Sequence, residues 1–356
     1  MIKIAIVGLG NCASFLIQSI EYYKNKKNVP ELAYPLIGKY KISDIEVVCA
    51  IDVDSRKVNK DISEAIFEPD TINTVKIADV PKKGIKVIKG PVLDGIGEYL
   101  SKIVKINHKQ RPVNVIKKIK ESGAEILINY LPVGSYKASR YYANAALKSN
   151  CAFINCIPEF IASDNNWIKF FEKTNLPIIG DDVKGTVGAS VLSRTLVRLF
   201  TSRGCKIDRM YQLNFGGNTD FFNLLEESRL KYKKISKTET VQSQMPKRLE
   251  DYQIHIGPSD YVSWLKSRKI AHIRIEGRTF GNIPINFDAR LDVEDKSVSA
   301  GIVVDAVRCC KLALERNIGG ILHSPSAYFM KHPPIQMSDE EARKRLEMFI
   351  AGKIER

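Results

Sequence analysis

The sequence predicts an α/β protein in which a doubly wound parallel sheet is followed by a second, α+β domain with a mixed open sheet. In the first half, apolar runs of strand length alternate with amphipathic helical patterns, an order typical of βαβ units. After about Arg203 the pattern changes to strands in which apolar and polar residues alternate, as in a sheet with one exposed face. With 356 residues, the chain is long enough to bury two sizeable cores.

The first half contains five short apolar runs that are bounded by turn residues. IKIAIVG at 2–8 indicates a buried strand, and an amphipathic helix is expected from Asn11 to about Lys24. IEVVCAID at 45–52 predicts the second strand, with a helical stretch from Ser55 to Phe67. The remaining strands are expected at 125–132, 151–158 and 176–182, with helices at 112–122, 135–149 and 164–174.

The connection between the first helix and the second strand, residues 23–43, is unusually long for a doubly wound fold. Long connections in compact domains usually have a role of their own. We therefore expect an insertion here that serves function or an interface.

The second half begins with three alternating runs, at 210–217, 269–277 and 284–293, and continues with a strong helical pattern at 299–317. The C-terminal helices are expected to return to the first sheet. The predicted division is therefore a first domain from 1–205 and 306–356, and a second, sheet-based domain from 206–305.

Composition indicates an ordinary soluble globular protein, with 44% hydrophobic and 27% charged residues. No run of 18 or more apolar residues occurs, so we expect no transmembrane helix. The first strand begins at Ile2, which leaves no room for a signal peptide. The seven cysteines show no CxxC spacing, and their odd number excludes a full set of internal disulfides. Reduced thiols in a cytoplasmic protein are the simplest interpretation.

The formal net charge of +15 has three interpretations. Nucleic acid is the obvious partner, but basic segments such as 231–234 and 266–269 are short and lack interleaved aromatic residues. A lysine-rich solvated surface is the plain alternative. The third interpretation is a positive field that gathers an anionic substrate such as a sugar phosphate.

The opening stretch MIKIAIVGLGNCAS has the spacing of a Rossmann dinucleotide site. Gly8 would make the tight turn, Gly10 would let the backbone approach a pyrophosphate, and Ala13 would pack the helix on the sheet. Asp52 ends the second strand, where an acid binds the ribose 2′-hydroxyl of NAD and repels the 2′-phosphate of NADP. We therefore expect NAD; a strand-to-helix turn without a ligand is the alternative.

Two further stretches are candidates for chemistry. GDDVKGTVG at 180–188 lies at the end of a parallel strand, where its backbone N–H groups could hold a phosphate, although Asp182 could equally be only a helix cap. Lys233 and Lys237 are four residues apart, so they share one face of a helix. Clustered ammonium groups lower one another's pKa and free an amine for base catalysis, but a solvated lysine face is the alternative. The five histidines form no metal-ligand pattern. Ser, His and Asp form no nucleophile elbow, so the sequence does not indicate a hydrolase.

Many longer motifs are similar to those of the myo-inositol-1-phosphate synthases of the short prokaryotic type. The resemblance covers nearly the whole chain. It is carried by IAIVGLGNCASFL, KDISEAIF, TVKIADV, GPVLDGIG, NYLPVGS, FIASD, PIIGDDVK, LNFGGNTDF, KKISKT, HIGPSDYV, EGRTFG and SAYFMKHPP.

The resemblance implies an NAD-dependent isomerase that converts D-glucose 6-phosphate to 1L-myo-inositol 1-phosphate. In that family carbon 5 is oxidised, carbon 6 loses a proton, the enolate closes on carbon 1, and the ketone is reduced again. The cofactor is regenerated in every turnover, so no net redox occurs. Family members form homotetramers through the second domain, which would then carry catalysis and oligomerisation. They differ in using a divalent metal or a monovalent cation, and the sequence does not decide between these.

The resemblance also implies a set of site residues. Lys233 with Asp182 would take the hydroxyl proton at carbon 5, Lys237 with Lys269 would polarise the carbon 1 carbonyl, and Lys331 with Asp295 would stabilise the enolate. The expected cofactor contacts are Gly8, Gly10, Asn11, Cys12, Ala13, Asp52, Leu131, Pro132 and Asp182, and the expected phosphate contacts are Gly185, Thr186, Val187 and Gly188.

Three other functions fit parts of this pattern. A semialdehyde- or homoserine-type NAD(P) dehydrogenase would share the architecture but release NADH in proportion to product. A catalytically silent nucleotide-binding regulator would bind NAD and tolerate loss of Lys237. A nucleic-acid-binding protein is the last alternative, and it would retain DNA in a salt-sensitive manner.

Overall fold

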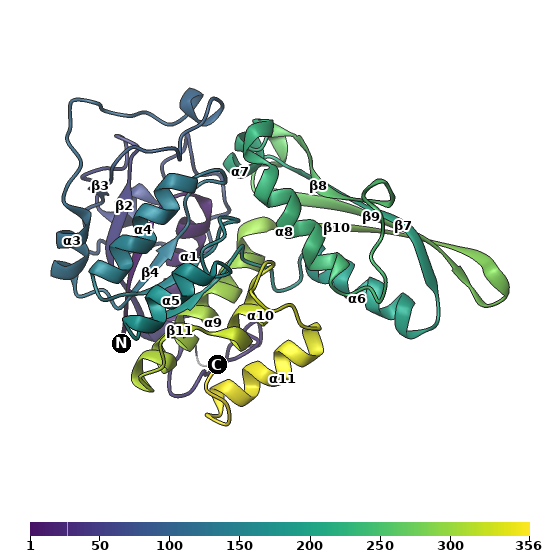
Figure 1. The fold of residues 1–356 in the computed structure, drawn as a ribbon. Coiled ribbons are helices and arrows are strands. Elements are labelled where there is room, and N and C mark those ends of the chain that lie inside the picture. The colour runs from purple at the N-terminus through teal and green to yellow at the C-terminus, as the bar shows by residue number, and fades with distance from the viewer. Residues whose placement is uncertain (27) are drawn as a thin grey trace.

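A computed structural model describes residues 1–26 and 28–356, and it contains two separate sheets (Figure 1). The first sheet has seven strands in the order β11-β6-β5-β4-β1-β2-β3, and every neighbouring pair is parallel. The second has four strands in the order β10-β9-β7-β8, with β7 parallel to β8 and antiparallel to β9. These sheets confirm the predicted fold class.

The first sheet contains the strands expected in the first half, most of them shorter than the apolar runs. Its strands are β1 (Ile2–Val7), β2 (Ile45–Asp52), β3 (Ile88–Lys89), β4 (Ile126–Asn129), β5 (Ala152–Asn155), β6 (Pro177–Ile179) and β11 (Gly320–Ile321). The helices around it are α1 (Asn11–Tyr23), α2 (Ile62–Ala65), α3 (Val115–Ser122), α4 (Tyr136–Lys148), α5 (Asn165–Lys173), α9 (Asp295–Glu315), α10 (His323–Phe329) and α11 (Asp339–Ile350).

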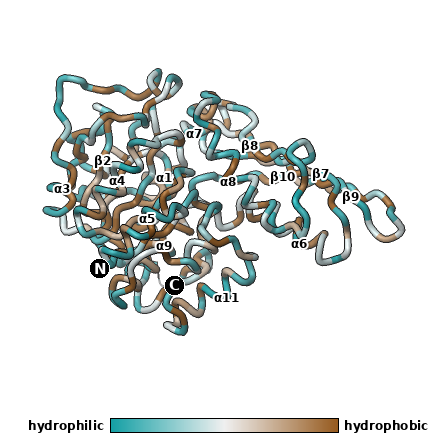
Figure 2. Tube along the Cα trace, in the orientation of Figure 1, coloured by the Kyte–Doolittle hydropathy of each residue, from teal (hydrophilic) through white to brown (hydrophobic). Residues whose placement is uncertain are grey.

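Helices cover both faces of the first sheet because its strands are buried on both sides. Along β1, Ile4 and Ile6 belong to the core beneath α1 and α9, whereas Ala5 and Val7 belong to the core beneath α3, α4 and α5. The strands therefore read as continuous apolar runs, as expected for a parallel sheet. In Figure 2, hydrophobic segments run through the interior of this part of the molecule.

The prediction of a helix at 55–67 is wrong, because only one turn of helix, α2, forms within this range. The backbone of residues 59–62 pairs with residues 85–87 instead: the Asn59 N–H donates to Val87 O, and the Val87 N–H donates to Lys60 O, each at 2.8–2.9 Å. Asn59 also has a φ of 70°, which no right-handed helix contains. Tertiary pairing therefore overrides the local helical pattern.

The long 23–43 connection packs over α9, except that Lys27 lies outside the described residues. Leu32, Ile37 and Tyr40 are buried in the core shared with α9, and the Arg308 guanidinium donates to the carbonyls of Tyr34 and Tyr40 at 2.8 and 3.3 Å. The insertion thus holds the long helix on the sheet.

The second sheet extends away from the first as an arm (Figure 1). Its strands are β7 (Lys206–Gly216), β8 (Ile254–Tyr261), β9 (Arg268–Thr279) and β10 (Ile283–Glu294), and its helices are α6 (Ala189–Ser202), α7 (Thr219–Asn223) and α8 (Lys231–Gln242). Leu196, Val197 and Phe200 of α6, with Val241 of α8, cover one face of this sheet. No helix of the described residues covers the other face.

The packing of two helices differs from the expected domain boundaries. α6 falls before the expected boundary at 205–206 but packs on the second sheet. α9 crosses the expected boundary at 305–306: its first residue donates its N–H to Ser267 O beside β9, and residues 302–313 pack in the first core. No helix within the described ranges is long and apolar enough to cross a membrane.

Candidate active site

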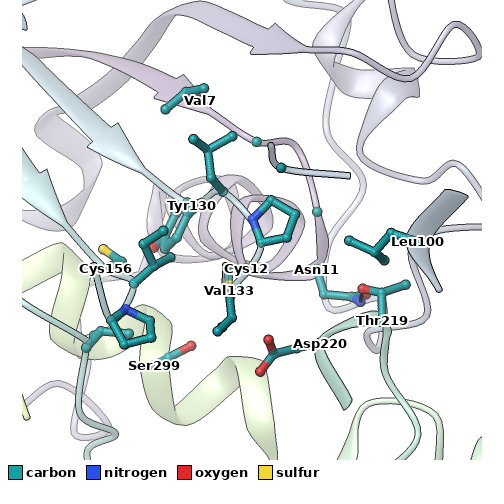
Figure 3. A pocket seen from close by; sticks show the side chains of 18 of the residues that line it. Val7, Asn11, Cys12, Leu100, Tyr130, Val133, Cys156, Thr219, Asp220 and Ser299 are labelled. Carbon is teal, nitrogen blue, oxygen red and sulfur yellow. Dashed lines mark hydrogen bonds between the residues drawn. The ribbon is translucent and has the colours of Figure 1, made fainter. Parts of the chain in front are cut away.

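A pocket lies at the carboxyl ends of the central parallel strands, where the arm meets the first sheet (Figure 3). Ligands bind at this edge in open α/β sheets because the strand order changes direction there. The structure brings most of the predicted site residues to this pocket: Gly8, Gly10, Asn11, Cys12, Asp52, Leu131, Pro132, Asp182, Gly185, Gly188, Lys233, Lys237, Lys269, Asp295 and Lys331. Ala13, Thr186 and Val187 do not line it.

The glycine turn leaves room for a ligand to approach the protein backbone. Gly8 has a φ of +88°, and a Cβ there would lie 2.6 Å from Tyr130 O, so a side chain is excluded. Around Gly10 nothing lies within 4 Å of a Cβ position, which leaves the start of α1 open toward the pocket. Ala13 is fully buried in the core behind this turn. These features fit a pyrophosphate at the helix N-terminus.

Asp52 connects the end of β2 to the glycine turn. Its Oδ2 accepts the Leu9 N–H at 2.8 Å, and its Oδ1 accepts the N–H groups of Val53 and Asp54 at 2.7 and 2.9 Å. The buried Lys57, which the sequence analysis missed, donates to Leu9 O at 2.8 Å and lies 3.9 Å from Asp52 Oδ2. The carboxylate therefore fixes the turn and still borders the pocket.

Asn11 lines the pocket, and its side chain also makes structural contacts. Its Oδ1 accepts the N–H groups of Asn73 and Thr74, and its Nδ2 donates to Thr219 Oγ1 at 3.1 Å. Asn11 and Thr219 lie side by side in Figure 3. The side chain thus joins the first sheet to the α7 segment of the arm.

The first charged cluster surrounds Asp182, which follows β6. Its Oδ1 lies 3.1 Å from Lys331 Nζ and 3.5 Å from Lys233 Nζ, and its Oδ2 accepts the Ser236 hydroxyl at 2.7 Å. Burial alone would raise the pKa of Asp182, but the two ammonium groups hold it well below its usual range. The carboxylate is therefore ionised and shared by two lysines.

The second charged cluster surrounds Asp295 at the start of α9. Its Oδ1 accepts from Lys269 Nζ at 3.0 Å, and its Oδ2 accepts from Lys296 Nζ at 2.7 Å and from Asn218 Nδ2 at 3.2 Å. Burial would raise the pKa of Asp295, but Lys269 and Lys296 hold it well below the usual value. Lys296 lines the pocket although no motif had indicated it.

Lys237 lies between these clusters without a counter-ion. It shares the inner face of α8 with Lys233 and Ser236, and no hydrogen bond or salt bridge of its ammonium occurs among the described residues. Burial, together with the charges of Lys233, Lys269 and Lys331, puts the pKa of Lys237 well below its usual value. Such an amine can be neutral at physiological pH and accept a proton.

One expected pairing is wrong. Lys331 pairs with Asp182 rather than with Asp295, which Lys269 and Lys296 hold. The backbone explains this pairing. The Lys331 N–H donates to Asp182 O at 2.7 Å, so the segment that follows α10 lies beside the residues that follow β6. Its ammonium also donates to Val183 O at 2.6 Å.

The expected phosphate segment is only partly available to a ligand. Gly185 and Gly188 border the pocket, and Gly188 precedes α6, whose first N–H groups have no partners within the helix. The Thr186 N–H already donates to Val298 O at 2.8 Å, and Val187 is 62% exposed. A phosphate would therefore meet the first turn of α6 rather than Thr186 or Val187.

The carboxylates of the pocket offer a poor site for a divalent metal. Asp182 and Asp295 each already contact two ammonium groups. Across residues 1–26 and 28–356, no group of three or more His, Cys, Asp or Glu side chains is arranged to hold a metal ion. A divalent cation here would lie among like charges.

Comparisons with known proteins agree on one family. Residues 188–296 match the family model of myo-inositol-1-phosphate synthase. Inositol-3-phosphate synthase of Mycolicibacterium smegmatis is 49% identical over 99% of this chain and 98% of the relative. Inositol-3-phosphate synthase of Corynebacterium glutamicum is 47% identical over 98% of both chains. In fold, the crystal structure of a myo-inositol-1-phosphate synthase-related protein from Thermotoga maritima has a TM-score of 0.77 and 22% identity, covering 99% of this chain and 98% of its own.

Proposed function

The chain belongs to the myo-inositol-1-phosphate synthase family, and we propose on this basis that it converts D-glucose 6-phosphate to 1L-myo-inositol 1-phosphate with NAD as a catalytic cofactor. The observation that carries this proposal is a group of five lysines around two aspartates beside the glycine turn, none with a side chain more than 20% exposed. An isomerisation through enolate and alkoxide states needs this combination of fixed positive charge and proton carriers.

The glycine turn supports NAD as the cofactor. The open start of α1 at Gly10 would receive the pyrophosphate, and Asp52 would accept a ribose hydroxyl and disfavour a 2′-phosphate. Leu131 and Pro132 form the wall after β4. When bound, NAD supplies a reversible acceptor for the hydrogen of carbon 5, and the chain's own residues supply all proton transfers.

The charge of the pocket suits a dianionic sugar phosphate. The seven lysines that line the pocket formally exceed its five aspartates by two charges. Such a surplus in a recessed site attracts an anion and strengthens its binding. We place the phosphate at the first turn of α6, near Gly185 and Gly188.

The proton carriers divide between the two clusters. Burial would lower the pKa of Lys233, but Asp182 raises it above the usual value, so Lys233 stays an ammonium and donates to the carbon 5 oxygen. Burial lowers the pKa of Lys331 to about 8, so this amine takes the hydroxyl proton when carbon 5 is oxidised. Lys237 accepts a proton as a neutral amine, and the ammonium thus formed acts with Lys269 on the carbon 1 oxygen during ring closure. Lys331 acts with Asp182 on the carbon 5 oxygen, since this is the carboxylate that it contacts.

The second sheet supports a homotetramer and the catalytic role expected for the arm. Within residues 1–26 and 28–356, no helix packs on one face of this sheet, and Tyr211, Leu213 and Phe215 of the inner strand β7 lie on that face. A second copy would cover this face. We further propose a cytoplasmic location, which is supported by the seven cysteines, all of them free thiols.

The decisive experiment incubates the purified protein with glucose 6-phosphate and a catalytic amount of NAD⁺. Inositol phosphate is followed by ³¹P NMR and NADH by its absorbance. Product without net NADH, and its loss in Lys237→Ala, is the expected result. NADH that rises in proportion to product would instead indicate a dehydrogenase of the semialdehyde or homoserine type.

A further inference from the structure

Lys296 is a buried lysine of the pocket to which the proposed reaction has so far assigned no role. It is the second residue of α9, is 6% exposed, and its ammonium lies 2.7 Å from Asp295 Oδ2. The other oxygen of Asp295 already accepts from Lys269 at 3.0 Å. The single negative charge of Asp295 therefore offsets only part of the positive charge of the two ammonium groups.

This position is unfavourable for a lysine on structural grounds alone. The N-terminus of a helix carries partial positive charge, so a cation in the first turn of α9 is repelled by the helix dipole. Burial adds the loss of ammonium hydration. Because Lys269 already provides Asp295 with a partner, packing does not require a second cation there. Residues that oppose local stability in this way are typical of functional sites.

The charge of Lys296 is permanent, unlike that of Lys237. Burial alone would lower the pKa of Lys296, but Asp295, followed by Cys12 and Asp220, raises it above the usual value. The group is therefore an ammonium throughout the physiological range and does not carry protons. Its effect on a reaction is electrostatic.

Lys296 lies where the glycine turn, which would hold the cofactor, meets the part of the pocket that would hold the sugar. It lines the wall together with Cys12 of the glycine turn, Asp220 of α7 and Ser299 of α9. The last three side chains surround the same opening in Figure 3. A charge there lies between the expected cofactor and the lysines that would contact the sugar.

We propose that Lys296 is a built-in cation of this site: its ammonium occupies the place at Asp295 that a metal or monovalent cation would otherwise take, and it stabilises the negative oxygen that forms during enolisation and ring closure. The chain then needs no added cation. This inference rests on the proposed function and extends it.

The test compares wild type with Lys296→Ala and with the matched control Lys234→Ala, which removes an exposed lysine of α8. Turnover is measured after chelator treatment in a tetramethylammonium buffer, then with Mg²⁺, Mn²⁺, K⁺ or NH₄⁺ added. Wild type and control should be active without any addition. Lys296→Ala should lose about 10²- to 10³-fold in kcat, as when one preorganised charge-stabilising group is removed, and should recover in part with NH₄⁺ or a divalent cation.

A binding measurement separates this inference from the proposed function. Mn²⁺ is titrated into NAD-loaded protein and followed by electron paramagnetic resonance, with thermal unfolding as the check on folding. Lys296→Ala should bind Mn²⁺ and wild type should not. A wild type that requires or binds a cation, or a variant that shows neither cation rescue nor Mn²⁺ binding, would overturn the inference. A wild type inactive toward glucose 6-phosphate under every condition would refute the proposed function, while the Mn²⁺ comparison would still decide what occupies Asp295.

Discussion

Lys331 Nζ lies 3.1 Å from Asp182 Oδ1, although 149 residues separate the two in the chain. The contact is fixed by main-chain pairing, because the Lys331 N–H donates to Asp182 O and the His332 N–H donates to Asp181 O. Lys233 of α8 meets the same carboxylate oxygen at 3.5 Å. Through these contacts the carboxylate of Asp182 links the first sheet to the arm and to the C-terminal segment.

The first prediction concerns this carboxylate. Asp182→Asn keeps the shape of the side chain but leaves Lys233 and Lys331 without their counter-charge. We expect kcat to fall at least about 10²-fold, and the free energy of unfolding to fall by about 3–5 kcal/mol, as when one partner of a buried ion pair is removed. Steady-state kinetics and urea unfolding measure both.

The control for this prediction is Asp79→Asn, at a carboxylate that is 92% exposed beside Lys76. It should change the free energy of unfolding by no more than about 0.5 kcal/mol. Wild-type turnover in Asp182→Asn would show that the Asp182 cluster does not take part in the reaction.

The second prediction concerns Lys237, whose ammonium is buried without a counter-ion. Lys237→Met should abolish turnover but raise the melting temperature, because it replaces a desolvated amine with an apolar side chain of similar length. NAD affinity should remain close to that of wild type. Lys234→Met, at the exposed neighbour on α8, should alter none of these quantities. A variant that is both inactive and destabilised would mean that Lys237 supports the fold instead.

The sequence predicted the parts of the molecule that depend on local pattern. The strands of the first sheet are continuous apolar runs, and the glycine turn follows from the spacing of Gly8, Gly10 and Ala13. The failures come from long-range pairing. Residues 59 and 60 pair with Val87, and Asn59 has a positive φ, so the helix does not begin before Ile62; the partner of Lys331 is set by a contact with the end of β6.

The site was predicted less completely than the fold because charge and burial are properties of the assembled molecule. Lys233 and Lys237 were expected on one helix face, but only the structure shows that Lys237 has no counter-ion within the described residues. Lys296 was missed because a lysine beside an aspartate, as in VEDKSV, is an ordinary surface pattern. What distinguishes Lys296 from a surface lysine is the burial of its side chain at the start of α9.

The third prediction concerns cofactor choice. Asp52→Asn retains an oxygen that can accept the Leu9 N–H but removes the negative charge beside the expected ribose. The ratio of Kd for NADP to Kd for NAD should fall, because the 2′-phosphate is no longer repelled and Lys57 lies 3.9 Å from the carboxylate. Calorimetric titration with both cofactors measures this ratio. An unchanged ratio would remove Asp52 from the ribose site.

The fourth prediction concerns the open face of the arm. Leu213 lies on the inner strand β7 opposite His272 of β9, on the face that no helix in the described part of the chain covers. Leu213→Asp places a charge within the proposed subunit contact, so light scattering should detect a tetramer for wild type and a smaller species for the variant. Tyr252→Asp, at an exposed aromatic residue just before β8, serves as the control and should remain tetrameric. A tetrameric Leu213→Asp would place the contact elsewhere.

The last prediction follows from Lys184, whose side chain is buried. Lys184 is one of the residues that line the pocket. Its ammonium donates to Ala327 O at 2.7 Å and lies 3.5 Å from Asp339 Oδ1, an oxygen that also accepts from the buried Arg194. Burial first, and the charge of Arg194 second, lower the pKa of Lys184 from 10.5 to about 7. Between these two values the unfolded chain holds a proton that the folded chain has released.

The sign of the pH dependence follows from this proton balance. Wherever the unfolded state binds more protons, stability rises with pH, here from about pH 7 to about pH 10. Lys184→Met removes the titrating group, so the variant should be more stable than wild type near pH 6. Its advantage should shrink by up to ~1.4 kcal/mol per pH unit as the pH rises through that window. Urea unfolding at several pH values measures the difference, and Lys344→Met, at an exposed lysine of α11, should show none. A difference between Lys184→Met and wild type that does not vary with pH would mean that Lys184 is protonated to the same extent in both states.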